Sequence, residues 1–147
     1  MAGFNNTPPA SEFHRHSVGL GHVGSYQVSV RPYLLSNITV PVLSSGTPEE
    51  IQFPNVTKFV IITNALPGSS ANVPLRVGFS APGVRGDVED NYIILNNNES
   101  FEAEFKVTSI FLLSDSESTV TASIAAGLTG IPRSHLPNNW SGMDGVG

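Results

Sequence analysis

The chain has 147 residues, of which 13% are charged, with a formal net charge of −5 and no cysteine. This length fits one domain that can bury its own core. The lysines and arginines are few and scattered, which argues against direct nucleic-acid binding, because phosphate recognition needs clustered basic residues. The lack of cysteine excludes disulfide bonds, thiolate-bound zinc and a thiol nucleophile.

The N-terminal sequence, MAGFNNTPPASEFHRH, has no basic region followed by an apolar run, so we expect no secretory signal peptide. No apolar run is long enough to cross a bilayer, so we expect no membrane partner. The expected place of synthesis is therefore a cytoplasm.

A first strand is predicted within residues 17–35, where apolar and polar side chains alternate up to Pro32. Residues 37–43, NITVPVL, predict a second short strand, with Pro41 at a sheet edge or a bulge. A loop follows, and residues 50–54, EIQFP, form a third extended segment.

The most strongly predicted strand is KFVIIT, residues 58–63, because it is dense in β-branched side chains and has no helical period. A turn-rich segment separates it from LRVGFS, residues 75–80, in which Leu75, Val77 and Phe79 point to one face. We predict that these two strands form an antiparallel pair joined by a long loop.

A second loop is expected over residues 81–91, and residues 92–105 predict two strands joined by a tight turn at Asn96–Asn98. Alternation in the second of these strands sends its phenylalanines inward and its carboxylates outward. The last two strands are predicted in residues 106–113 and 119–131, on either side of a turn.

Eight or nine strands are therefore expected, and no ten-residue stretch has a helical period. This pattern predicts an all-β fold, a single β-sandwich or jelly roll over residues 17–131. Residues 1–16 and 132–147 are rich in Pro, Gly and Asn and are predicted to be terminal arms. Each arm is either a disordered tail or a segment that becomes ordered along a partner.

Two motifs are candidate binding sites for a metal or a cofactor. His14, His16 and His22 have a spacing that could place imidazoles on one face of a strand, but solvated histidines in an arm are the favoured interpretation. The glycines of GLGHVG match the dinucleotide fingerprint only formally, because that fingerprint needs a strand before it and a helix after it. We expect no metal and no cofactor.

The paired carboxylates lie in predicted surface loops, where they do not converge on a cleft as general acid–base work requires. The acidic loop DVEDN lacks the ligand pattern of an EF-hand, and no serine lies in a Gly-x-Ser-x-Gly elbow. The sequence therefore predicts a protein without enzymatic activity.

Three segments stand out in chain order: HSVGLGHVGSYQVSVRPYL, FPNVTKFVIITNALPGSSANVPLRVGFSAPG and STVTASIAAGLTGIP. Taken in this order, they resemble small structural proteins of tailed-bacteriophage virions, especially head decoration or cement proteins. The resemblance implies a β-sandwich or jelly roll that assembles as dimers or trimers. It also implies binding to the major capsid protein on the outer capsid surface, reinforcement of the head against internal DNA pressure, and assembly in the host cytoplasm.

Arginine and aromatic side chains are enriched at protein interfaces. On that basis the predicted interface residues are His14, Arg15, His16, Tyr26, Arg31, Pro32, Tyr33, Arg133, His135 and Trp140. Two alternatives stay open here: the tyrosines could belong to the core, and Trp140 could fold back on its own sandwich.

Other functions remain as alternatives. A neck or tail adaptor of the virion differs from a decoration protein only in location. A carbohydrate-binding sandwich would need aromatic platforms on a concave face, and a small hydrolase would need a convergent acid, base or nucleophile cluster.

Overall fold

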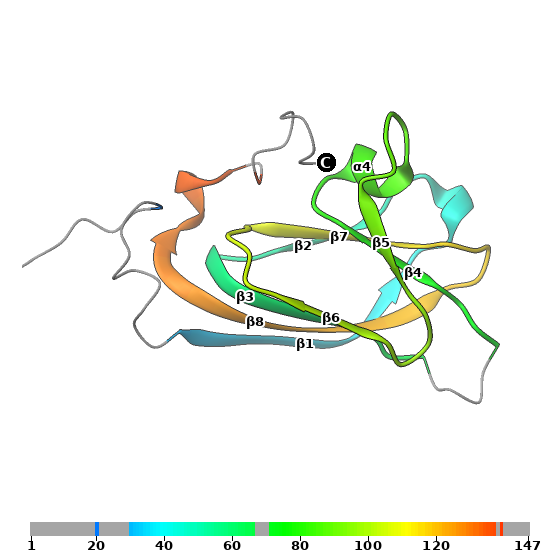
Figure 1. Cartoon of the computed structure of the whole chain (residues 1–147), viewed down its shortest axis with the longest axis horizontal. Coiled ribbons are helices and arrows are strands. Elements are labelled where there is room, and N and C mark those ends of the chain that lie inside the picture. The colour runs from blue at the N-terminus through cyan, green and yellow to red at the C-terminus, as the bar shows by residue number, and fades with distance from the viewer. Residues whose placement is uncertain (1–19, 21–29, 67–70, 138, 140–147) are drawn as a thin grey trace, which may run out of the picture.

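A computed structural model of the chain describes residues 20, 30–66, 71–137 and 139. Within these ranges eight strands form two antiparallel four-stranded sheets, which lie as two layers in Figure 1. Sheet A has the order β1 (Arg31–Val40), β8 (Val120–Pro132), β3 (Asn55–Asn64) and β6 (Ser100–Ala103). Sheet B has the order β2 (Glu49–Gln52), β7 (Ser109–Ser114), β4 (Leu75–Gly78) and β5 (Tyr92–Leu95).

The strand pairing is that of a jelly roll. The first strand pairs with the last and so on inward, β1 with β8, β2 with β7, β3 with β6 and β4 with β5. A long hairpin rolled across two sheets produces this order. The predicted all-β sandwich is confirmed.

The core lies between the sheets and follows the alternation of the strands. Inward side chains of sheet A include Val60, Ile62, Ile124 and Ala126, and those of sheet B include Leu75, Val77, Ile110 and Leu112. All eight are at most 3% exposed. Each fully buried Val, Leu or Ile side chain stabilises the fold by about 1.5–3 kcal/mol relative to exposure.

The predicted pairing of residues 58–63 with 75–80 is wrong. Both segments are strands, but β3 lies in sheet A between β8 and β6, whereas β4 lies in sheet B between β7 and β5. The buried Asn64 side chain marks the crossing: its Nδ2 donates to the carbonyl oxygens of Val73, at 2.9 Å, and Leu95, at 3.0 Å. The Asn64 amide, at the end of β3 in sheet A, thus binds the backbone just before β4 and at the end of β5 in sheet B.

The turn at Asn96–Asn98 is present, and it also connects the two sheets rather than two paired strands, since β5 and β6 lie in different sheets. Asn98 has a φ of 62°, in the left-handed region that asparagine tolerates. Its N–H donates to the carbonyl oxygen of Asn64 at 2.9 Å, so this turn is fixed to the end of β3.

The two strands predicted nearest the N-terminus differ from the observed strand. The later part of the first and most of the second join into one continuous strand, β1, with an irregular register between Leu35 and Ile38. Asn37, inside this bulge, has a φ of 56°. Pro41 follows the strand directly, and residues 21–29 lie outside the described ranges.

The expected loop over residues 81–91 contains a short helix, α4 (Ala81–Arg85). The Ser80 hydroxyl accepts a hydrogen bond from Gly83 N at 3.0 Å, which caps the first turn. Val84 is fully buried. A Cβ added to Gly78 of β4 would lie 3.1 Å from the Cβ of Val84. The helix therefore packs on the part of the outer face of sheet B that contains Gly78. Five residues are too few to produce a detectable helical period in the sequence.

The predicted C-terminal arm begins inside the folded body. The C-terminal segment, residues 133–137 and 139, includes a 3-10 helix (Arg133–His135) and two buried side chains, Leu136 and Asn139. Leu136 packs with Val56 and Ile131 in a second, smaller core. The remaining part of this predicted arm, 140–147, and the whole N-terminal arm, 1–16, lie outside the described residues.

Candidate functional site

The outer face of sheet A carries an apolar stripe, which we define as Leu34, Phe59, Ile61 and Ala125. Leu34 on β1 is opposite Ala125 on β8, and Ala125 is opposite Ile61 on β3. The Leu34 side chain is 73% exposed, and the other three are half-buried. An apolar row thus crosses three adjacent strands on the face that points away from the core.

Two shallow hollows lie along the stripe and share Ile61. The first, of about 350 Å³, is lined by Leu34, Leu35, Ser36, Ile61, Thr63, Ser123, Ile124 and Ala125. The second, of about 450 Å³, is lined by Phe59, Ile61, Glu102, Ala103 and Glu104. The polar edge of the first hollow is held by a 2.7 Å hydrogen bond between the hydroxyls of Thr63 and Ser100. The surface is therefore apolar at its centre and polar at its edge.

Gly127 of β8 fixes one end of the stripe. A Cβ at this position would overlap the Phe59 ring and would lie 2.6 Å from Cγ2 of Val30. Only a residue without a side chain lets Phe59 and Val30 lie over the strand here. The phenyl ring consequently lies over Gly127 and lines the second hollow together with Ile61.

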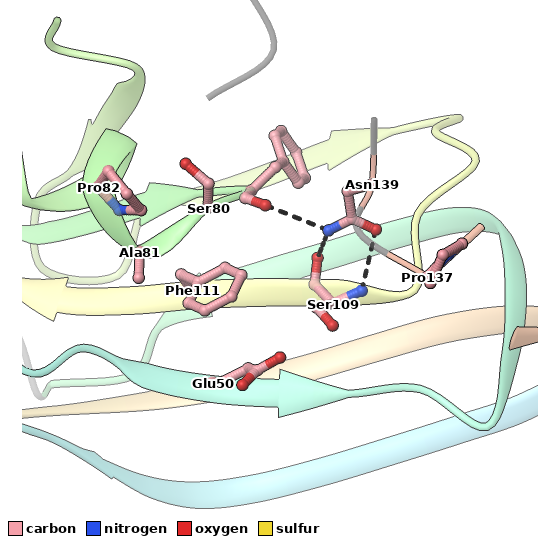
Figure 2. A pocket seen from close by; sticks show the side chains of 9 residues that line it. Glu50, Ser80, Ala81, Pro82, Ser109, Phe111, Pro137 and Asn139 are labelled. Atoms are coloured by element: carbon pink, nitrogen blue, oxygen red, sulfur yellow. Dashed lines mark hydrogen bonds between the residues drawn. The ribbon is translucent and has the colours of Figure 1, made fainter. Parts of the chain in front are cut away.

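The outer face of sheet B has a smaller hollow of about 120 Å³, drawn in Figure 2. Its lining includes Glu50, Phe111, Pro137 and Asn139. The Asn139 amide is already occupied: Nδ2 donates to the carbonyl oxygens of Ser109 and Phe79, at 2.6 and 3.2 Å (Figure 2). The volume is well below the roughly 300–1,000 Å³ of typical small-molecule sites, so this hollow is a weak candidate for ligand binding.

Charged side chains in the described part of the chain form structural contacts or point to solvent. Arg76 pairs with Asp115 at 2.6 Å and donates to the carbonyl oxygens of Val84 and Arg85, at 3.3 and 3.2 Å. Its guanidinium carbon also lies 4.3 Å from the centre of the Tyr92 ring. Arg76 therefore fastens the C-terminal end of α4 to sheet B.

Within the described ranges, no group of three or more His, Asp or Glu side chains is arranged to hold a metal ion. The same residues include no helix that is both long and apolar enough to cross a membrane.

Apart from Arg133, the predicted interface residues separate into three groups. Arg31, Pro32 and His135 are exposed. Tyr33 instead packs against the core, with its ring edge-on to Phe53 at a centroid distance of 5.2 Å. Five further residues lie outside the described ranges: His14, Arg15, His16, Tyr26 and Trp140.

Arg133 is held inside its own subunit. One guanidinium nitrogen donates to the carbonyl oxygens of Phe53, at 3.1 Å, and Thr108, at 2.9 Å, and the other donates to the Ser109 hydroxyl at 3.1 Å. These contacts join the C-terminal segment to two parts of the body. The structure thus gives Arg133 an internal role.

The apolar stripe was missed because arginine and aromatic content guided the choice of interface residues. The segment FVII, residues 59–62, carried the missing signal. Antiparallel strands with one solvated face normally alternate apolar and polar side chains. An uninterrupted apolar run therefore indicates that both faces of β3 are apolar.

No protein-family model matches the chain, and no curated protein matches it either.

Proposed function

We propose that this chain is a non-enzymatic structural protein of a phage virion, which binds the outer capsid surface and stabilises the head. Its proposed partners are the major capsid protein and other copies of itself. The observation that carries the proposal is the apolar stripe on the outer face of sheet A, considered together with the sequence resemblance to decoration proteins.

The stripe has the properties of a protein-binding surface. Exposed apolar surface surrounded by polar residues marks interaction sites on soluble proteins. Leu34 is 73% exposed, and Ile61 lies close by on the same face. Ladder hydrogen bonds already hold the three strands, so binding would cost little conformational entropy. Many copies on a symmetric shell would add avidity to contacts that are individually weak.

Two of the predicted interface residues, Arg31 and Pro32, lie near this surface. Arg31 and Pro32 are exposed at the start of β1, on the strand that also carries Leu34. Val30 lies over Gly127 at one end of the stripe. Val30, the first residue of the described range 30–66, therefore lies beside the proposed capsid-binding face.

The fold supports a virion role by analogy alone. Jelly rolls occur in viral capsid proteins, and they also occur in lectins and cupins. Because one architecture serves many functions, it does not choose among them. The order of the three resembling segments is what favours a virion protein here.

The proposal can be tested with phage particles that carry the full-length chain. We expect Leu34→Glu to remain folded, because substitutions at exposed sites usually change stability by about 0.5 kcal/mol or less. We expect this variant to bind heads poorly and heads assembled with it to open at a lower temperature. Thr39→Glu is the matched control, since Thr39 is exposed on the same strand outside the stripe.

Each outcome is informative. Normal head binding by Leu34→Glu would exclude the stripe as the capsid-binding face. Electron microscopy of labelled particles locates the chain directly: label only at the neck or tail would favour the adaptor function, and its absence from particles would contradict a virion role.

A further inference from the structure

The two sheets end in four edge strands, β1 and β6 in sheet A and β2 and β5 in sheet B, among the described residues. An exposed edge offers unpaired backbone groups to another chain, and proteins usually oppose such pairing with prolines, bulges or charges. The four edges differ sharply in this respect.

Three of the edges carry such features. β1 contains Pro32 and the bulge near Asn37. β2 is only four residues long, contains two glutamates and lies between Pro48 and Pro54. β6 contains Glu102, with Glu99 and Glu104 on either side. A second chain would meet proline, irregular backbone or carboxylates at each of them.

β5 is also four residues long, and Glu89 and Asp90 lie shortly before it. The strand itself, YIIL, has no charge and no proline, however, and its register with β4 is continuous. Ile93 is 39% exposed and Ile94 is 45% exposed, although both lie in a regular strand. β5 pairs with β4 along one side, and the other side of β5 is the edge of sheet B. Among the edges of the described part of the chain, β5 is thus the one whose own residues include no proline, bulge or charge.

We propose that β5 is a self-association site, at which β5 of a second copy pairs antiparallel about a two-fold axis. The two sheets B would then form one continuous sheet across the dimer. Such an interface is self-complementary, because the same residues contribute from both copies. This inference deepens the part of the proposed function in which copies of the chain bind one another.

Side-chain pairing favours one register. If Ile93 faces Ile93 of the second copy, Tyr92 faces Ile94, and an aromatic side chain opposite a β-branched one is a favourable cross-strand pair. A register centred on Ile94 would instead place Tyr92 opposite Asn96 of the second copy. Acidic residues do not separate the two registers, because Asp87 faces Glu99 in the first and Glu89 faces Glu99 in the second, all outside β5. We therefore assign the register centred on Ile93.

The dimer should be weak in dilute solution. A single pair of four-residue strands buries far less than the roughly 1,200–2,000 Å² of stable interfaces. We expect a dissociation constant on the order of micromolar or higher. Concentration on a capsid lattice would favour the paired state by mass action.

Sedimentation velocity of the full chain over a concentration series tests the proposal. We expect the unsubstituted chain to show a monomer–dimer equilibrium and Ile94→Glu to raise the dissociation constant by about tenfold or more. Leu34→Glu is the matched control, because it adds the same charge to an exposed apolar position in the other sheet. It should leave the dimer intact. A dimer that survives Ile94→Glu, or a chain that stays monomeric at every concentration, would overturn the proposal.

Cysteine cross-linking provides a second readout that does not depend on Ile94. The chain has no cysteine, so Ile93→Cys introduces a single thiol at the position that faces itself. Directly opposed residues of antiparallel strands have Cα atoms about 4.5–5.5 Å apart, within the range of a disulfide. We expect oxidation to link two copies of Ile93→Cys and not of Thr39→Cys on the edge strand β1. Equal cross-linking of both variants would contradict the assigned register.

The two proposals fail separately. If Leu34→Glu dimerises but does not bind heads, the stripe is the capsid-binding face and β5 is independent of it. If heads bind the unsubstituted chain and no dimer or cross-link forms, the capsid proposal stands and the β5 inference is wrong.

Discussion

Asn139 and Ser109 are joined by two hydrogen bonds that imitate a strand pairing. Asn139 Nδ2 donates to the Ser109 carbonyl oxygen at 2.6 Å, and the Ser109 N–H donates to Asn139 Oδ1 at 3.2 Å (Figure 2). The same oxygen accepts from Thr108 N at 2.6 Å. One side-chain amide therefore satisfies the backbone at the start of β7 and holds the C-terminal segment on the body.

Replacing Asn139 should destabilise the fold. Asn139→Ala leaves the buried backbone groups of Thr108 and Ser109 without these partners, at a cost of about 1–3 kcal/mol for each unsatisfied group. Chemical denaturation measures the loss in the free energy of unfolding. Ser134→Ala is the control, since Ser134 is exposed in the same segment. Equal stability of both variants would mean that the segment contributes little to the body.

Arg133 should behave as a structural residue. Its guanidinium binds two carbonyl oxygens and a hydroxyl in different directions, and the ammonium group of lysine does not reproduce that planar fork. We expect Arg133→Lys to lower the free energy of unfolding by about 1–3 kcal/mol. At a temperature where the variant is folded, head binding should be unchanged. Reduced head binding by a fully stable variant would restore Arg133 to the interface.

Gly127 should not tolerate a methyl group. Overpacking of this kind typically costs about 1–3 kcal/mol, and we expect that loss for Gly127→Ala. Gly130→Ala on the same strand is the matched control, because a Cβ there meets no atom within 4 Å. Thermal unfolding of the two variants compares them directly.

A double mutant identifies the clash. If the added methyl group collides with the Phe59 ring, Gly127→Ala should cost less in a Phe59→Leu background than in the unsubstituted chain. Additive losses would show that Phe59 is not the obstacle.

Arg76 should contribute more than Arg85 to the free energy of unfolding. Arg76→Met keeps the apolar stem but removes the bonds to Asp115 and to the α4 carbonyl oxygens, so we expect a loss of about 1–3 kcal/mol. Hydrogen exchange over residues 81–91 should increase at the same time. Arg85→Met is the control, because the Arg85–Asp87 pair is more exposed and such pairs contribute about 0–1 kcal/mol. Similar losses for both variants would contradict the fastening role of Arg76.

The local sequence pattern was sufficient to predict most of the strands and which of their side chains point into the core. Alternation in LRVG placed Leu75 and Val77 in the core, and β-branched density in KFVIIT identified β3. Strand formation and the choice of inward face depend on neighbouring residues with a period of two, so they can be read from short segments. The all-β sandwich or jelly roll follows from that information.

Which strands pair with one another could be determined only from the tertiary structure. β3 pairs with β8 and β6, which lie far along the chain, because the buried Asn64 and the turn at Asn98 direct the chain from sheet to sheet. No local period encodes such long-range contacts. The internal contacts of Tyr33, Arg133 and Asn139 are likewise decided by which distant groups they meet. Exposure of Leu34 and Ile94 depends on what the finished sheets leave uncovered, and so both proposed binding surfaces became visible only in three dimensions.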